Sequence, residues 1–104
     1  MARILVLYNQ PADPAAFDRY YFETHTPLAL KIPGLQRLTV SDGPVTLLAG
    51  GAAPYLVAQL DFASMADLQA ALASPEGQTT AGDLANFAQA GVTLLAMETK
   101  EPQA

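Results

Sequence analysis

The amino-acid sequence predicts an α+β fold of the ferredoxin-like type, with the element order βαββαβ. Four short apolar segments have the length and the β-branched content of strands. Two longer stretches, in which apolar residues recur every three or four positions, have the pattern of helices. Because crossover connections are right-handed, this order gives a four-stranded antiparallel sheet that carries its helices on one face.

The first strand is expected at residues 3–8, whose apolar side chains point alternately to both faces. Asp13 and Pro14 then mark a helix start, since aspartate accepts a hydrogen bond at the N-cap and proline has a helical φ. The stripe that this helix should bury is Phe17, Tyr20/Tyr21, Thr24 and Leu28. Pro27 predicts that the regular helix ends or kinks at Thr26.

Three further strands are expected at residues 35–41, 55–62 and 92–99. A long hairpin-like connection, residues 42–53, joins the second strand to the third. The tail, residues 100–104, is expected to be loose.

The second helical region should begin at Ser64, break near Ser74-Pro75 and resume over residues 76–90. The inward residues predicted for it are Met65, Leu68, Ala71 and Leu72 before the break, and Leu84, Phe87 and Ala88 after it.

The composition predicts a single domain over residues 1–104 and a partner for one face of its sheet. Hydrophobic residues make up 51% of the chain and charged residues 14%, which is much apolar surface for a small domain to bury alone. The strands at 3–8 and 55–62 are apolar on both faces, whereas the helices cover only one face. We therefore expect a homodimer in which two sheets pack face to face.

The charge and residue content argue against several classes of function. The net charge is −5 and the five basic residues are scattered, so there is no basic patch for nucleic acid or for an anionic membrane surface. With no cysteine, one histidine and dispersed carboxylates, no metal site is expected. No apolar run approaches the roughly 20 residues of a membrane span. The expectation is a soluble cytoplasmic protein without nucleic-acid or membrane partners.

Residues 17–35, FDRYYFETHTPLALKIPGL, carry the most chemistry in the chain, and they resemble the EthD family. The matching positions are Phe17, Tyr20, Tyr21, His25, Pro27 and Leu28, followed by Lys31-Ile32-Pro33-Gly34-Leu35. Later matches are Pro54-Tyr55, Phe62-x-Ser64, Ser74-Pro75-Glu76-Gly77 and Ala81-Gly82-Asp83-Leu84-x-Asn86-Phe87. The resemblance implies a dimeric α+β barrel, in which two ferredoxin-like protomers enclose a pocket between sheet and helices.

The resemblance implies less about the reaction. The family's namesake is similar to proteins encoded beside an ether-degrading oxygenase system, and fungal relatives act on polyketides as decarboxylases or dehydratases without metal or organic cofactor. Neighbouring families include cofactor-independent monooxygenases, which are oxidoreductases of aromatic polyketides, and haem proteins whose proximal histidine lies outside this motif. We therefore expect no cofactor, in a fold that supports several reactions.

His25 is the candidate acid/base, because a neutral imidazole near pH 7 can take a proton from an acidic carbon or a phenol and return it. The alternative is a histidine that caps the helix end by bonding a terminal carbonyl. Tyr21 lies four residues earlier on the same helix face, where its hydroxyl would orient a substrate carbonyl, bond the imidazole or simply pack in the core. Together His25 and Tyr21 form the predicted catalytic pair.

The residues predicted to contact a substrate are Phe17, Tyr20, Thr24, Leu28 and Lys31. Three of them have simpler alternatives. Tyr20 would pack in the core, Thr24 would bond back to the main chain, and Lys31 would neutralise the carbonyls of the helix end.

Two functions are consistent with these residues. The first is a cofactor-independent enzyme that acts on a small apolar or aromatic oxygenated metabolite by proton transfer, decarboxylation, dehydration or oxygenation. The second is a non-catalytic accessory protein that binds such a metabolite for a degradative oxygenase system. A third possibility is a dimer whose pocket is vestigial and binds no ligand. Whether residues 42–53 close over the pocket is left open by the sequence.

Overall fold

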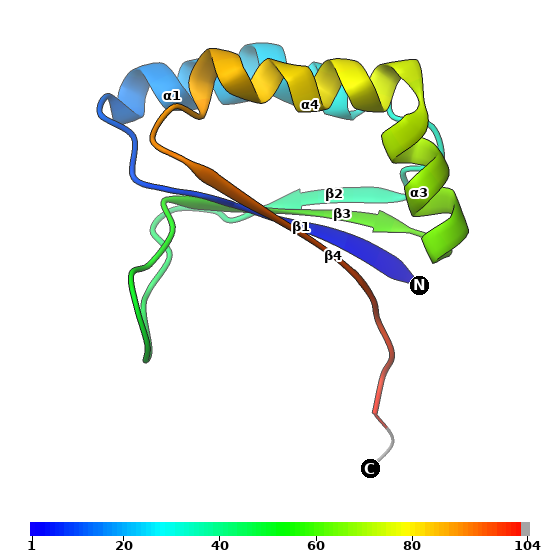
Figure 1. The fold of residues 1–104 in the computed structure, drawn as a ribbon. Helices are drawn as coiled ribbons and strands as arrows, with labels where there is room; N and C mark the ends of the chain where they lie inside the picture. Colours follow the sequence, from blue (N-terminus) through cyan, green and yellow to red (C-terminus); the bar gives the residue numbers. More distant parts are fainter. Residues whose placement is uncertain (103–104) are drawn as a thin grey trace.

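The computed structural model describes residues 1–102, which form a four-stranded sheet with the strand order β2-β3-β1-β4 and helices on one face (Figure 1). The strands are β1 (Ala2–Tyr8), β2 (Arg37–Val40), β3 (Leu56–Phe62) and β4 (Val92–Glu98). Every neighbouring pair in this sheet is antiparallel. The ferredoxin-like α+β fold and its element order are therefore confirmed.

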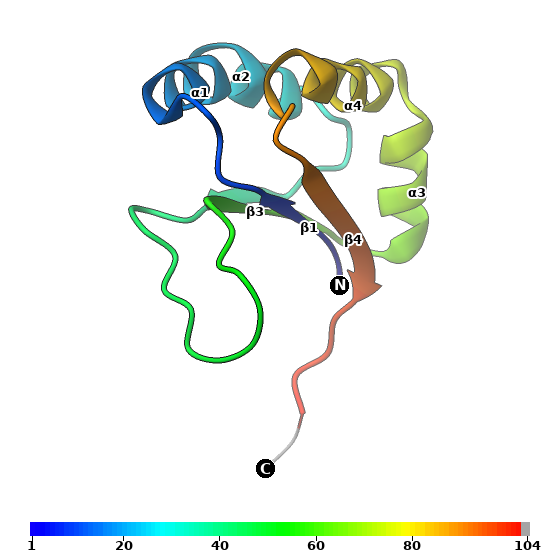
Figure 2. The same cartoon turned by 60° about the vertical axis from the view of Figure 1, so that its left-hand side comes forward.

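The helices form a layer over one face of the sheet (Figure 2). The first run consists of α1 (Pro14–Tyr20), the π-helical turn η1 (Tyr21–His25) and α2 (Thr26–Ala29). The second consists of α3 (Met65–Ala73) and α4 (Pro75–Phe87). Both predicted starts are confirmed, because the side chain of Asp13 accepts from Ala16 N and that of Ser64 from Asp67 N, each at 3.1 Å. None of these helices is both long enough and apolar enough to span a membrane.

The first helical run is irregular just before Pro27, where the sequence predicts an end or a kink of the regular helix. The run does not end at Thr26: it widens into η1 and continues as α2 to Ala29. The backbone N–H of Thr26 donates to the carbonyl of Tyr21, five residues earlier, and its hydroxyl donates to the same oxygen at 2.9 Å. A proline ring clashes with the carbonyl four residues before it in an α-helix. The wider π-turn relieves this clash, so the chain passes through Pro27 without stopping.

The π-turn also changes which side chains face the sheet. The buried residues of this run are Phe17, Tyr21, His25 and Ala29, at intervals of four. Because a π-turn contains more residues than an α-turn, positions four apart stay on one face. The predicted stripe is therefore wrong beyond Tyr21, since Thr24 is exposed and Leu28 is only half-buried. This shift places His25 in the core.

The break between α3 and α4 lies at Ser74, as predicted. Its hydroxyl donates to Ala71 O at 2.6 Å and accepts from Gly77 N at 3.0 Å, so one side chain ends α3 and begins α4. The inward stripe is correct for Leu68 and Ala71, which are buried, and Leu72 also faces the space between helices and sheet although it is 43% exposed. In α4, Phe87 is buried and the helix ends there rather than at residue 90.

The two faces of the sheet have different neighbours. The face under the helices forms the core with Ile4, Val6, Tyr8, Leu56, Ala58, Leu60 and Phe62. The opposite face has no helix over it in the described part of the chain (Figure 2). We call it the open face. Its apolar residues, from the alternation and register of the strands, are Leu5, Leu7, Val57, Leu95 and Met97.

The connection between β2 and β3 projects away from the helices, on the open-face side of the sheet (Figures 1 and 2). Leu48, within it, is 94% exposed. The connection therefore does not cover the space between sheet and helices in its own protomer. Of the predicted loose tail, residues 100–102 have no regular structure, and residues 103–104 lie outside the described residues.

Candidate functional site

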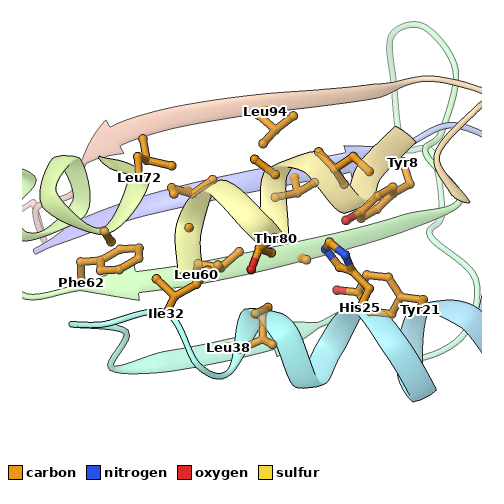
Figure 3. A pocket seen from close by; sticks show the side chains of 18 residues that line it. Tyr8, Tyr21, His25, Ile32, Leu38, Leu60, Phe62, Leu72, Thr80 and Leu94 are labelled. Atoms are coloured by element: carbon orange, nitrogen blue, oxygen red, sulfur yellow. The ribbon is translucent and has the colours of Figure 1, made fainter. Parts of the chain in front are cut away.

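A cavity lies between the inward face of the sheet and the helices (Figure 3). The space open to the centre of a water molecule is about 60 Å³. This space is large enough for more than one water molecule and suits a small ligand. Most of its lining is apolar, and within the described residues the polar side chains that reach it are those of Tyr8, Tyr21, His25 and Thr80. Residues 42–53 contribute nothing to this lining.

His25 is buried at one end of this cavity, where η1 meets α4. Its side chain has a relative exposure of 6%, and its ring centroid lies 4.6 Å from that of Phe87 and 5.6 Å from that of Tyr21. Its Nδ1 atom lies 3.0 Å from Oδ2 of Asp83, a residue of α4. The histidine thus bonds a carboxylate in another helix. The alternative, in which it caps its own helix by bonding a carbonyl, is not the arrangement found.

Asp83 is held by two further donors. The hydroxyl of Tyr20 donates to Oδ1 at 2.6 Å, and Nδ2 of Asn86 donates to the same oxygen at 2.9 Å. This leaves Oδ2 for His25. Burial opposes ionisation of the carboxyl, but the hydrogen bonds from Tyr20, Asn86 and His25 together outweigh it and lower the pKa of Asp83. Asp83 is therefore a carboxylate at neutral pH.

The carboxylate of Asp83 determines the tautomer of His25. An ionised carboxylate only accepts hydrogen bonds, so Nδ1 of the imidazole must carry the proton that it donates. Burial lowers the pKa of His25, and the hydrogen bond and charge of Asp83 offset this only in part. The ring is neutral at pH 7, and Nε2 has a free lone pair. A neutral imidazole in this tautomer is equipped to accept a proton.

Tyr8 and Tyr21 add two hydroxyl groups at the same end of the cavity. Each residue is 2% exposed, and their ring centroids lie 5.5 Å apart. Figure 3 shows both hydroxyl oxygens and the His25 imidazole gathered there. Burial raises the pKa of Tyr21 to about 12 and that of Tyr8 further above its ordinary value. Both phenols are therefore neutral donors at any physiological pH.

The predicted site residues fall into two groups. Tyr21 and His25, the predicted catalytic pair, both line the cavity. The predicted substrate contacts Phe17, Tyr20, Thr24, Leu28 and Lys31 are absent from its lining. Thr24 and Lys31 are exposed, and Phe17 packs in the aromatic core. Tyr20 neither contacts the cavity nor simply packs, because its hydroxyl bonds Asp83.

Sequence reasoning missed Asp83 and Tyr8 as site residues. Asp83 belongs to the last matched motif, yet a carboxylate in an amphipathic helix normally lies in solvent. The available signal was its spacing, three residues after Thr80 and four before Phe87, which places it on the buried side of α4. The alternation of residues 3–8 groups Tyr8 with Ile4 and Val6 on one face of the strand, but nothing in the sequence indicates which core tyrosine borders a cavity.

Within residues 1–102, no three histidine, cysteine, aspartate or glutamate side chains lie together as metal ligands would.

The fold and this site define a class: a small ferredoxin-like α+β protein with a buried histidine–aspartate pair at an apolar cavity. Residues 9–91 match the model of the EthD domain. The chain belongs to the EthD family, which confirms the resemblance of residues 17–35. A Rhodococcus erythropolis protein, an uncharacterized 11.0 kDa protein in the thcB–thcC intergenic region, is 48% identical over 96 residues, 91% of each chain.

Solved structures of related proteins have the same fold. An ethyl tert-butyl ether d (EthD) family protein of Bacillus halodurans C-125 is 35% identical, with a TM-score of 0.86 over 96% of this chain and 99% of that one. Two more distant structures share the fold alone. A dimeric ferredoxin-like protein of Thermobifida fusca has 15% identity and a TM-score of 0.67, covering 94% of this chain and 90% of that one. SnoaB, a cofactor-independent oxygenase of Streptomyces nogalater, has 18% identity and a TM-score of 0.64, covering 97% and 94%.

Proposed function

We propose that this protein is a cofactor-independent enzyme that transfers a proton to or from a small, neutral, apolar oxygenated metabolite. His25 is the acid/base, and Asp83 is the residue that positions it. The observation that carries the proposal is the hydrogen bond of 3.0 Å between His25 Nδ1 and Asp83 Oδ2 beside an apolar cavity. Similarity in fold to a cofactor-independent oxygenase supports chemistry without a cofactor in this architecture.

The contents of the cavity favour proton transfer over nucleophilic catalysis. The residues that line it include no serine or cysteine in the described chain, and the hydroxyl of Thr80 already donates to Glu76 O at 2.8 Å. A nucleophile activated by the histidine would have to lie within hydrogen-bond reach of it. Burial raises the pKa of both Tyr8 and Tyr21, which disfavours their phenolates as nucleophiles, so the imidazole remains as the reactive group.

Exchange of carbon-bound hydrogen in D₂O tests this function without knowledge of the natural substrate. The probes are small neutral ketones, aldehydes, esters and phenols, followed by NMR, and at least one of them should exchange faster with the wild-type protein. In the His25→Gln variant that rate should fall by at least about 10²-fold, the contribution expected of a positioned acid/base. Glutamine is polar and similar in length, so the variant should keep its circular dichroism spectrum.

The pH profile of this exchange should identify the group. The base must be neutral, and burial lowers the pKa of His25. The wild-type rate should therefore rise with pH, and the midpoint of this rise should lie below the ordinary histidine value of about 6.5. An exchange rate that is unchanged in His25→Gln would contradict the proposed role. Binding of a probe without any catalysed exchange would favour the accessory, metabolite-binding function instead.

We also propose that the open face is covered by a second copy of this chain. The apolar side chains Leu5 and Leu95 lie directly opposite each other on this face, in β1 and β4. Leu95 is 47% exposed in the protomer. A solved structure of the same fold is described as dimeric, which supports an assembly of this kind. Two such faces packed together bury the apolar residues of both sheets.

Replacing Leu95 by arginine should therefore convert a dimer into a monomer, because it would bury an unpaired charge between the sheets. Size-exclusion chromatography with light scattering measures the mass directly. Leu30→Arg is the matched control, since Leu30 is 60% exposed at the end of α2, away from the open face, and this variant should remain dimeric. A monomeric wild-type protein would refute the arrangement.

A further inference from the structure

Two of the four tyrosines have no partner for their hydroxyl groups within the described residues. Tyr20 donates to Asp83 at 2.6 Å and Tyr55 donates to Asp18 at 2.8 Å. Tyr8 and Tyr21 make no such bond, although each is 2% exposed. A buried hydroxyl without a partner is costly, so its presence needs an explanation.

The cavity supplies that explanation. Among the described residues, every side-chain oxygen or nitrogen that is fully enclosed has a hydrogen-bond partner. The hydroxyls of Tyr8 and Tyr21 must therefore open onto accessible space, and the cavity beside His25 is the space that both residues line. In Figure 3 both oxygens point to the end of the cavity that holds the imidazole. Each hydroxyl is thus free to donate to a molecule inside.

The charges around this end restrict the acceptor to a neutral oxygen. No lysine or arginine is among the described residues that line the cavity, whereas the carboxylate of Asp83 lies directly behind His25. A carboxylate or phosphate would lose its hydration here without gaining a cation. A carbonyl oxygen carries no net charge and has two lone pairs, so it can accept from both hydroxyls at once.

We propose that Tyr8 and Tyr21 together bind the oxygen of a neutral carbonyl compound, a small ketone, aldehyde or ester, with its α-carbon next to His25. This proposal rests on the proposed function and names the substrate class for it. Tyr8 and Tyr21 contact the substrate directly, so they are catalytic residues in this scheme. The size of the cavity favours a small compound.

The chemical step is a balanced proton transfer. Nε2 of His25 takes a proton from the α-carbon, so a C–H bond breaks and an N–H bond forms. The electron pair of the broken bond forms a carbon–carbon double bond, and the negative charge develops on the former carbonyl oxygen. The two hydroxyl donors then hold an enolate rather than a ketone, and their hydrogen bonds become stronger as the charge grows. The imidazolium returns the proton to carbon or oxygen, and no oxidant or reductant is required.

Binding of cyclopentanone, labelled with ¹³C at its carbonyl, tests the proposal separately from catalysis. Infrared difference spectra should show the labelled C=O band of the bound ketone at lower frequency than in an apolar solvent. Tyr8→Phe and Tyr21→Phe should each reduce this shift and weaken binding roughly 3- to 10-fold, and the double variant should abolish the shift. Methylenecyclopentane has the same shape without the oxygen, and its affinity should not fall in these variants.

Two further variants separate the outcomes. Tyr55→Phe removes a hydroxyl outside the cavity, so it should change neither the band nor the affinity. His25→Gln should keep the shifted band while it loses the exchange of α-hydrogen. Catalysed exchange without a tyrosine-dependent band shift would overturn the carbonyl site and leave the acid/base function in place. Failure of cyclopentanone to bind, or equal losses for ketone and hydrocarbon, would also overturn the site.

Discussion

An Asp83→Asn variant should lose between about 10²- and 10⁴-fold of the catalysed proton exchange while it keeps its fold. The reason is that the substitution changes which ring nitrogen of His25 carries the proton. Both Tyr20 and Asn86 donate to Oδ1 of Asp83, so the oxygen of the new amide takes that position. Its NH₂ group then faces Nδ1 of the imidazole, which must accept a hydrogen bond instead of donating one. The ring proton moves to Nε2, the atom that has to act as the base.

This prediction has a direct spectroscopic readout. The ¹⁵N chemical shifts of His25 distinguish a ring protonated at Nδ1 from one protonated at Nε2, so the wild type and the variant should show opposite tautomers. If Asp83 served only in packing, its substitution would not interchange the ¹⁵N chemical shifts of the two ring nitrogens. Rate loss with an unchanged tautomer would therefore contradict the positioning role of Asp83.

Asp18→Asn is the matched control, because Asp18 also accepts a tyrosine hydroxyl, that of Tyr55 at 2.8 Å. It lies on α1, away from the lining of the cavity. The two variants make the same chemical change at an aspartate–tyrosine hydrogen bond, yet only Asp83→Asn should alter the exchange rate. Equal losses in both would indicate a general effect on the fold.

The fold was predictable because local signals agreed with each other. The alternation in β1 separated Ile4 and Val6, which lie in the core, from Leu5 and Leu7 on the other face, although it did not indicate which face the helices cover. Asp13 and Ser64 were recognisable as helix caps from their residue types. Strand periodicity and cap chemistry depend on neighbours within a few positions, so a sequence reports them directly. The antiparallel topology then followed from the element order.

The site was predictable only in part, because it depends on contacts between elements far apart in the chain. His25 and Tyr21 stood out by residue type, but the partner of His25 lies 58 positions later in α4. The orientation of His25 also depends on η1, and a proline signals a disturbed helix without specifying a π-turn. A stripe counted with α-helical spacing therefore selected Thr24 and Leu28 instead of the buried His25 and Ala29.

Gly77 should be the position in α4 where a single methyl group does the most damage. A Cβ atom there would overlap the carbonyl oxygen of Ala71 and lie 3.0 Å from its carbonyl carbon and 3.2 Å from the hydroxyl of Ser74. The obstacle is backbone at the end of α3, which cannot rotate away as a side chain could. We expect Gly77→Ala to lower the free energy of unfolding by about 3 kcal/mol. Thermal unfolding should then occur roughly 10–20 °C lower.

Gly82→Ala, in the same helix, should have the opposite sign. Gly82 is exposed, and a Cβ atom there would meet no other atom within 4 Å. Alanine then gains only its better helix propensity, about 0.5–1 kcal/mol, so unfolding should shift a few degrees upward. If Gly77→Ala were also stabilising, the close approach of α3 and α4 at Ser74 would be wrong. That junction sets the direction of α4 and hence the position of Asp83, so the clash at Gly77 should weaken the catalysed exchange as well as the fold.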